Sequence, residues 1–116
     1  MTNEDRIRRA ESFLVADDGQ YLGRLTLNQF DAESISNPYG IYGSRYSAKS
    51  IRNEYSIYGS PYSALSPYNQ YTTTPPKIFL HGCYWGVLTT NGYLFALNKL
   101  SPSDLNNWMQ QNGLFY

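Results

Sequence analysis

The side chains best suited to chemistry lie together at His81-Gly82-Cys83. A thiol and an imidazole can act as a nucleophile and its general base. The same residues also fit a turn, at His81-Gly82, that leads into a strand. We expect strand and turn packing here and no catalytic residues. An enzyme built on His81 and Cys83, with the acids Asp31 and Glu33, stays open as an alternative.

Carboxylates could supply a cation site where Asp31 and Glu33 flank the tyrosine-rich segment. Asp17-Asp18-Gly19 lacks the alternating oxygen ligands of a calcium loop, and one His with one Cys is too few for the usual zinc sites. The chain also has no P-loop, no dinucleotide fingerprint and no Gly-x-Ser-x-Gly motif. We therefore expect no metal ion and no cofactor.

A sixteen-residue sequence occurs twice in succession, as SISNPYGIYGSRYSAK from residue 34 and SIRNEYSIYGSPYSAL from residue 50. A partial third copy keeps Asn69 and Tyr71, and Asn28 with Phe30 resembles a shortened copy upstream. Tyr-Gly-Ser, the serines and the asparagines are typical of tight turns. Two and a half copies are too few for a free-standing solenoid, because each copy must bury one face on a neighbour. We therefore expect ordered turns that lean on a sheet.

A second repeat relates GQYLGRLTLN (19–28) to GCYWGVLTTN (82–91), with six identities in ten positions. Preceded by the apolar runs FLV (13–15) and KIFL (77–80), each copy completes a unit that predicts strand, turn and strand. Alternation with period two puts Tyr, Gly and Leu of the second strand on one face. Asn91-Gly92 predicts a tight hairpin into a further strand over 93–98. Two related β-units therefore bracket the tyrosine-rich insert.

The sequence predicts one α+β domain over residues 1–116, with a small antiparallel sheet built from the two β-units, at about 13–28 and 77–98. Ser101-Pro102 predicts the start of a C-terminal helix, and Gly113 its end. The expected parts are an N-terminal helix (1–12), the first β-unit (13–28), the repeat insert (29–76), the second β-unit (77–98) and a C-terminal helix (101–113).

Charge and composition exclude several classes of function. Nine basic and nine acidic residues give a formal net charge of zero, which argues against broad capture of nucleic acid or an anionic membrane. Cys83 is the only cysteine, so no internal disulfide is expected. The first residues carry charges where a secretory signal would be apolar, and no run is long enough to span a bilayer. We expect a cytoplasmic protein by default.

Eight of the twelve tyrosines lie within residues 34–71. Tyr, Ser, Gly and Asn are the residues that antibody loops use for binding. We therefore expect a non-enzymatic binding module for a protein, peptide or carbohydrate, although rings that fill the core would explain the same composition. The candidate binding residues are equivalent positions of the two complete copies: Tyr42, Tyr46, Tyr58, Tyr62, Asn37 and Asn53.

The apolar C-terminus offers a structural alternative, in which the protein is a scaffold or forms a homodimer. Its candidate interface consists of Trp108, Leu114, Phe115 and Tyr116.

The repeat motif YGSxYSxxSIxNxY, preceded by YLGxLTxN and followed by Pro-Pro-Lys-Ile-Phe, resembles poorly characterised bacterial proteins that carry the same tandem phrase between β-units. The resemblance covers roughly residues 13–91 and its motif is specific. Those proteins often have Asp where this chain has Lys49 or Leu65. The resemblance implies this architecture and assigns no catalytic or binding residue.

Overall fold

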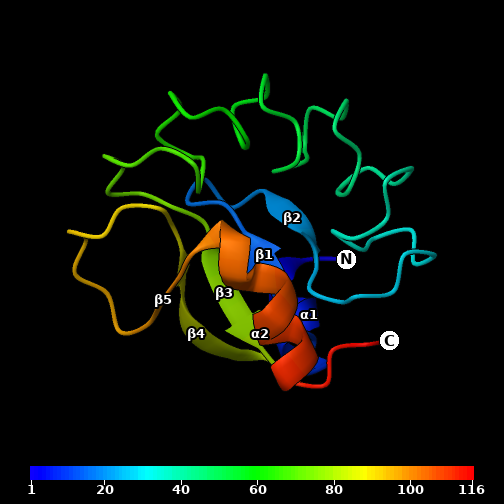
Figure 1. The fold of residues 1–116 in the computed structure, drawn as a ribbon. Helices are drawn as coiled ribbons and strands as arrows, with labels where there is room; N and C mark the ends of the chain where they lie inside the picture. The colour runs from blue at the N-terminus through cyan, green and yellow to red at the C-terminus, as the bar shows by residue number, and fades with distance from the viewer.

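The computed structural model describes residues 1–116 and contains one five-stranded sheet with the order β2-β1-β3-β4-β5 (Figure 1). The strands are β1 (Phe13–Val15), β2 (Tyr21–Arg24), β3 (Lys77–Leu80), β4 (Cys83–Leu88) and β5 (Lys99–Leu100). Neighbouring strands are antiparallel except β4 and β5, which pair in parallel. The α+β class is confirmed, whereas the expectation of an antiparallel sheet is corrected to a mixed one.

The two β-units meet at the centre of the sheet, where β1 pairs with β3 and the rings of Phe13 and Phe79 stack at 4.8 Å. At the outer edge of each unit the chain returns and runs parallel to the edge strand, beside β2 in the first unit and beside β4 in the second. The amide of Arg24 donates to the carbonyl of Glu33, and the amide of Val87 donates to the carbonyl of Asn98. The sequence repeat is therefore also a repeat of backbone pairing.

Glycines at equivalent positions of the two units permit this close return. A Cβ on Gly23 would lie 2.7 Å from the side chain of Ile35, and a Cβ on Gly86 would lie 2.2 Å from the carbonyl oxygen of Asn98. Any larger residue would push the returning segment away from the sheet.

The hairpin and strand expected at 91–98 do not form. The side chain of Asn91 accepts from the amide of Tyr93 and donates to the carbonyl of Thr72. These bonds turn the chain toward the end of the insert and out of the sheet. Residues 92–98 form a loop with Tyr93 and Phe95 fully exposed, and the chain then returns beside β4 as β5.

Short helices lie near both ends of the chain. Helix α1 (Asn3–Arg8) begins with a capping box between Thr2 and Asp5, and ends before residue 12 because Ala10 adopts a positive φ of 58°. No helix of the structure has the length and apolar character that a bilayer-spanning segment needs.

Helix α2 (Leu105–Gln111) follows a 3₁₀ turn at Pro102–Asp104. Its apolar stripe packs into the main core against residues of β1, β2, β3 and β4. Ser101 precedes the 3₁₀ turn, but its side chain makes no capping bond. The expected helix is therefore present and starts a few residues later than its sequence signal.

The insert is a coil of consecutive tight turns that follows an arc around the sheet (Figure 1). From Asp31 to Thr72 a backbone amide donates to the carbonyl three residues earlier, turn after turn. One step per copy spans four residues, at Gly40 to Ser44 and at Ser56 to Ser60. Four steps of three residues and one of four therefore make up the sixteen-residue period.

Side chains of the repeat hold these turns together and attach them to the sheet. Ser34 donates to the carbonyl of Thr26 and Ser50 to that of Tyr42, eight residues earlier in each case. Ile35 and Ile51 belong to the main core. The expectation that the insert is ordered and leans on the sheet agrees with this arrangement.

Candidate functional site

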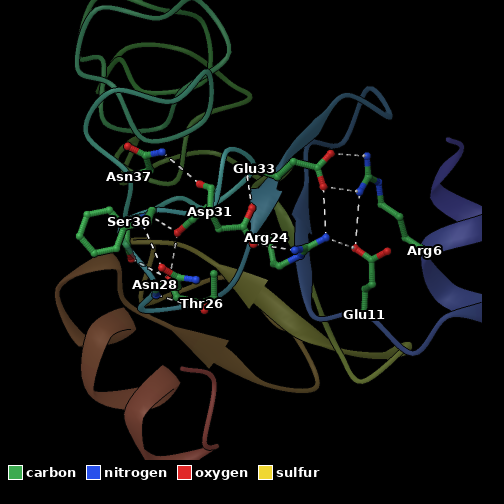
Figure 2. A network of polar contacts seen from close by, with 11 residues as sticks. Arg6, Glu11, Arg24, Thr26, Asn28, Asp31, Glu33, Ser36 and Asn37 are labelled. Carbon is green, nitrogen blue, oxygen red and sulfur yellow. Dashed lines mark hydrogen bonds and ion pairs between the residues drawn. The ribbon is translucent and has the colours of Figure 1, made fainter. Parts of the chain in front are cut away.

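The first turn of the insert is fixed to β2 and α1 by a network of ion pairs (Figure 2). Arg24 pairs with Asp31 at 2.6 Å, with Glu33 at 3.3 Å and with Glu11 at 3.4 Å, while Arg6 pairs with Glu33 and Glu11. Burial lowers the pKa of Arg24, but the carboxylates outweigh it and the net shift is upward. Asp31 and Glu33 therefore serve as partners of arginines, which explains these acids without a bound cation.

An aromatic contact lies behind this network. The guanidinium carbon of Arg6 lies 3.4 Å from the ring centroid of Tyr21, within cation–π range. The ring of Tyr42 meets Tyr21 edge-on at 4.9 Å. The Tyr21 hydroxyl is buried without a hydrogen-bond partner, and burial raises its pKa. Tyr42 thus attaches the first copy of the insert to β2.

The repeated asparagines use both polar side-chain atoms inside the coil. In Asn37, Asn53 and Asn69, Oδ1 accepts from the amide two residues later. The Nδ2 atom of each donates to the carbonyl six residues earlier. Asn37 and Asn53, which were candidate binding residues, are therefore occupied in holding one turn against the preceding one.

An exposed aromatic ring follows each of these asparagines by two positions. The same Asx turn forms at Asn28 and Asn91, where the side-chain oxygen accepts from the amide of Phe30 and of Tyr93. Together the five rings, here called the Asn-x-aromatic set, are 87 to 100% exposed. They are Phe30, Tyr39, Tyr55, Tyr71 and Tyr93.

The four tyrosines expected to bind separate into two equivalent pairs. Tyr46 and Tyr62 are exposed. Tyr42 is half-buried against Tyr21, and Tyr58 is buried in the main core, where burial raises the pKa of its hydroxyl. The structure therefore leaves Tyr46 and Tyr62 available to a partner and assigns Tyr42 and Tyr58 to packing.

Sequence reasoning gave no binding role to the Asn-x-aromatic set. Its signal was present, because an aromatic residue follows an asparagine by two positions at residues 28, 37, 53, 69 and 91, all outside helices and strands; the same triplet at Asn106 lies in α2, where Trp108 is buried. The Asx turn fixes the asparagine toward the coil and directs the following backbone outward. Recurrence of this triplet outside the sixteen-residue copies is the feature that would have found the set.

Three of the exposed tyrosines line one open cleft of about 1180 Å³ between the first turns of the insert. Tyr39 and Tyr55 come from the Asn-x-aromatic set, and Tyr46 lies between them in the chain. The polar residues of its wall include Gln29, Arg45, Arg52, Glu54 and Asn106, the last contributed by α2. The cleft therefore combines ring faces with hydrogen-bond donors and acceptors.

Of the candidate catalytic pair, His81 lies in the turn between β3 and β4 and Cys83 is the first residue of β4. His81 adopts a positive φ of 51° and donates its amide to Ser12, and Cys83 is a free, exposed thiol. No hydrogen bond joins the two side chains. No three side chains of His, Cys, Asp and Glu gather where they could hold a metal ion.

The candidate interface at the C-terminus is divided between core and surface. Trp108 and Leu114 are buried in the main core, where the Trp108 ring packs on Trp85 at 5.1 Å. Phe115 is half-exposed and Tyr116 almost fully exposed. Of the four candidate interface residues, only Phe115 and Tyr116 have side-chain surface that another molecule could contact.

No protein-family model, no curated protein and no solved structure matches this chain.

Proposed function

We propose that the protein is a non-enzymatic binding module that presents exposed aromatic rings to a protein, peptide or carbohydrate partner. The observation that supports this proposal is the Asn-x-aromatic set, in which five rings at equivalent turn positions are almost wholly exposed. Single exposed apolar residues are common on protein surfaces, but recurrence on the same turn makes a collective role the better explanation.

The rigidity of the turns favours binding. Each ring stands on a backbone held by an Asx turn, and in the copies from Asn37 onward also by a bond from Nδ2 to an earlier carbonyl. A ring on a fixed backbone loses only side-chain freedom when a partner covers it. The coil therefore provides large contact area at a low entropic penalty.

The experiment compares the wild-type protein with the Tyr39→Ala/Tyr55→Ala variant on immobilised glycan and peptide panels. Tyr116→Ala is the matched control, because it removes an equally exposed ring from outside the insert. The proposal expects binding to at least one panel member that the double variant loses and the control keeps. Absence of binding on both panels, or equal binding by the double variant, would contradict it.

A further inference from the structure

We propose that the ligand is a neutral β-1,4-linked polysaccharide of the cellulose or chitin type, and that the cleft lined by Tyr39, Tyr46 and Tyr55 is its principal site. This inference rests on the proposed binding function and names the ligand class for it. Three properties of the insert carry it: which residues recur, which polar atoms remain free, and what the cleft contains.

What recurs along the insert is the ring and not the charge. Tyr39 returns as Tyr55 and Tyr71, and Tyr46 returns as Tyr62. The cations do not return sixteen residues later, because Pro61 follows Arg45, Leu65 follows Lys49 and Tyr68 follows Arg52 at the equivalent positions. Single-stranded nucleic acid needs cations along its whole backbone, so a ligand read by these repeats has a neutral repeating unit.

The backbone of the insert has little to offer an extended peptide. The amides that close its turns donate to carbonyls three or four residues earlier, and others donate to asparagine or serine oxygens two residues earlier. The outer edge of β2 is paired at Arg24 with Glu33 and Ile35. Strand addition, in which a peptide bonds to a free sheet edge, is therefore closed at this side of the molecule. A ligand at this side of the molecule would therefore be bound by aromatic ring faces and by side chains at the rim of the cleft.

Ring faces of this kind suit pyranose units with equatorial substituents. Such units carry axial C–H bonds on both faces and hydroxyl groups around the edge. Packing a face on tyrosine buries apolar area, while the hydroxyls stay in water or meet polar side chains. A β-1,4 linkage keeps successive units in a flat ribbon, so several rings can contact one chain.

The composition and size of the cleft agree with a segment of such a ribbon. Its volume of about 1180 Å³ is at or above the upper end of pockets that enclose one small molecule, roughly 300–1,000 Å³. Around the three rings, Arg45 and Arg52 can donate to hydroxyls, Glu54 can accept, and Gln29 can do both. Mixed donors and acceptors of both charges fit hydroxyl groups better than an anionic ligand.

The test uses calorimetric titration of the full chain with cellohexaose and with chitohexaose. Isomaltohexaose, whose α-1,6 linkage breaks the flat ribbon, and oligo-dT are the comparison probes. We expect one or both β-1,4 hexasaccharides to bind with an affinity that changes little with salt. The Tyr39→Ala/Tyr55→Ala variant should bind about tenfold or more weakly, consistent with the loss of two aromatic contacts, and Tyr116→Ala should bind as the wild type does.

The outcomes separate this inference from the proposed function. If neither β-1,4 hexasaccharide binds while a peptide or another glycan does so through Tyr39 and Tyr55, the ligand class is wrong and the binding module stands. If oligo-dT binds with a steep salt dependence and the saccharides do not, the argument from charge is wrong. If no probe and no panel member binds, both proposals fail together.

Discussion

The hydroxyl of Tyr58 donates to the carboxylate of Asp18 at 2.9 Å, across forty positions of the sequence. Tyr58 belongs to the second copy of the insert, and Asp18 to the turn between β1 and β2. The bond joins the arc of turns to the sheet well beyond the Arg24 network, which holds only the first turn. Together with the contacts of Tyr42, Ile35 and Ile51, these separated attachments explain how a segment without helix or strand can keep a fixed path.

Tyr58→Ala should therefore act on stability. Truncating a buried aromatic side chain costs about 3–5 kcal/mol, whereas Tyr58→Phe, which removes only the hydroxyl, should cost about 1 kcal/mol. Chemical denaturation of both variants measures the difference. Tyr62→Ala is the control, because this exposed ring lies four residues later and should unfold within about 0.5 kcal/mol of the wild type. A Tyr58→Ala variant as stable as Tyr62→Ala would remove Tyr58 from the core.

Gly59→Ala should strongly destabilise the coil. The added Cβ would lie 2.1 Å from the carbonyl oxygen of Asn53 and 2.7 Å from that of Ile51, and neither backbone atom can move without disturbing its turn. Overpacking of this kind costs about 1–3 kcal/mol or more. Gly92→Ala is the matched control, because nothing lies within 4 Å of its Cβ position. Equal urea midpoints for the two variants would contradict the tight four-residue step.

Asn53→Asp should weaken the contact between successive turns. The aspartate keeps the oxygen that accepts from Tyr55, but it loses the Nδ2 donor and turns a carboxylate oxygen toward the carbonyl of Ser47. An unpaired, partly buried carbonyl costs about 1–3 kcal/mol. Thermal unfolding compares this variant with Asn107→Asp, an exposed position on α2. Equal unfolding temperatures for the two variants would show that the bond from Asn53 Nδ2 to the carbonyl of Ser47 contributes nothing to stability.

Tyr21→Phe should stabilise the protein and reduce its sensitivity to alkali. The hydroxyl is buried without a partner, so its removal should gain about 1 kcal/mol at neutral pH. Burial raises the pKa of Tyr21 in the folded state. Above the unfolded value of about 10, the unfolded chain releases this proton first, so the wild type loses stability as the pH rises further. Unfolding free energies from pH 7 to 11 should fall less steeply for Tyr21→Phe than for wild type or Tyr116→Phe.

Local sequence chemistry predicted much of this fold. The β-units, the Asx turns at Asn37 and Asn53, and the helix beginning after Ser101 all follow from residues within a few positions of one another. Self-similarity predicted two related β-units, and the equivalent glycines Gly23 and Gly86 meet the same steric demand in both. These features needed no knowledge of distant contacts.

Distant contacts decided the remainder. The hairpin signal at Asn91-Gly92 failed because the side chain of Asn91 bonds to Thr72, nineteen positions earlier, and the chain returns as a parallel strand. The exposure of each tyrosine depends on which side of its turn meets the sheet, as for Tyr58 at Asp18. Of the candidate binding tyrosines, Tyr46 and Tyr62 are exposed, and other exposed rings lie at positions that only the folded coil defines.

The most direct measurement is photo-CIDNP NMR of the tyrosines, which polarises only solvent-accessible rings, before and after addition of cellohexaose and, separately, of chitohexaose. The account predicts polarised signals from Tyr39 and Tyr55 in the free protein, no signal from Tyr58, and loss of the Tyr39 and Tyr55 signals as the ligand covers them. Silent Tyr39 and Tyr55 in the free protein would contradict the exposed set. Signals that persist at saturating ligand would show that the rings are exposed but do not form the binding surface.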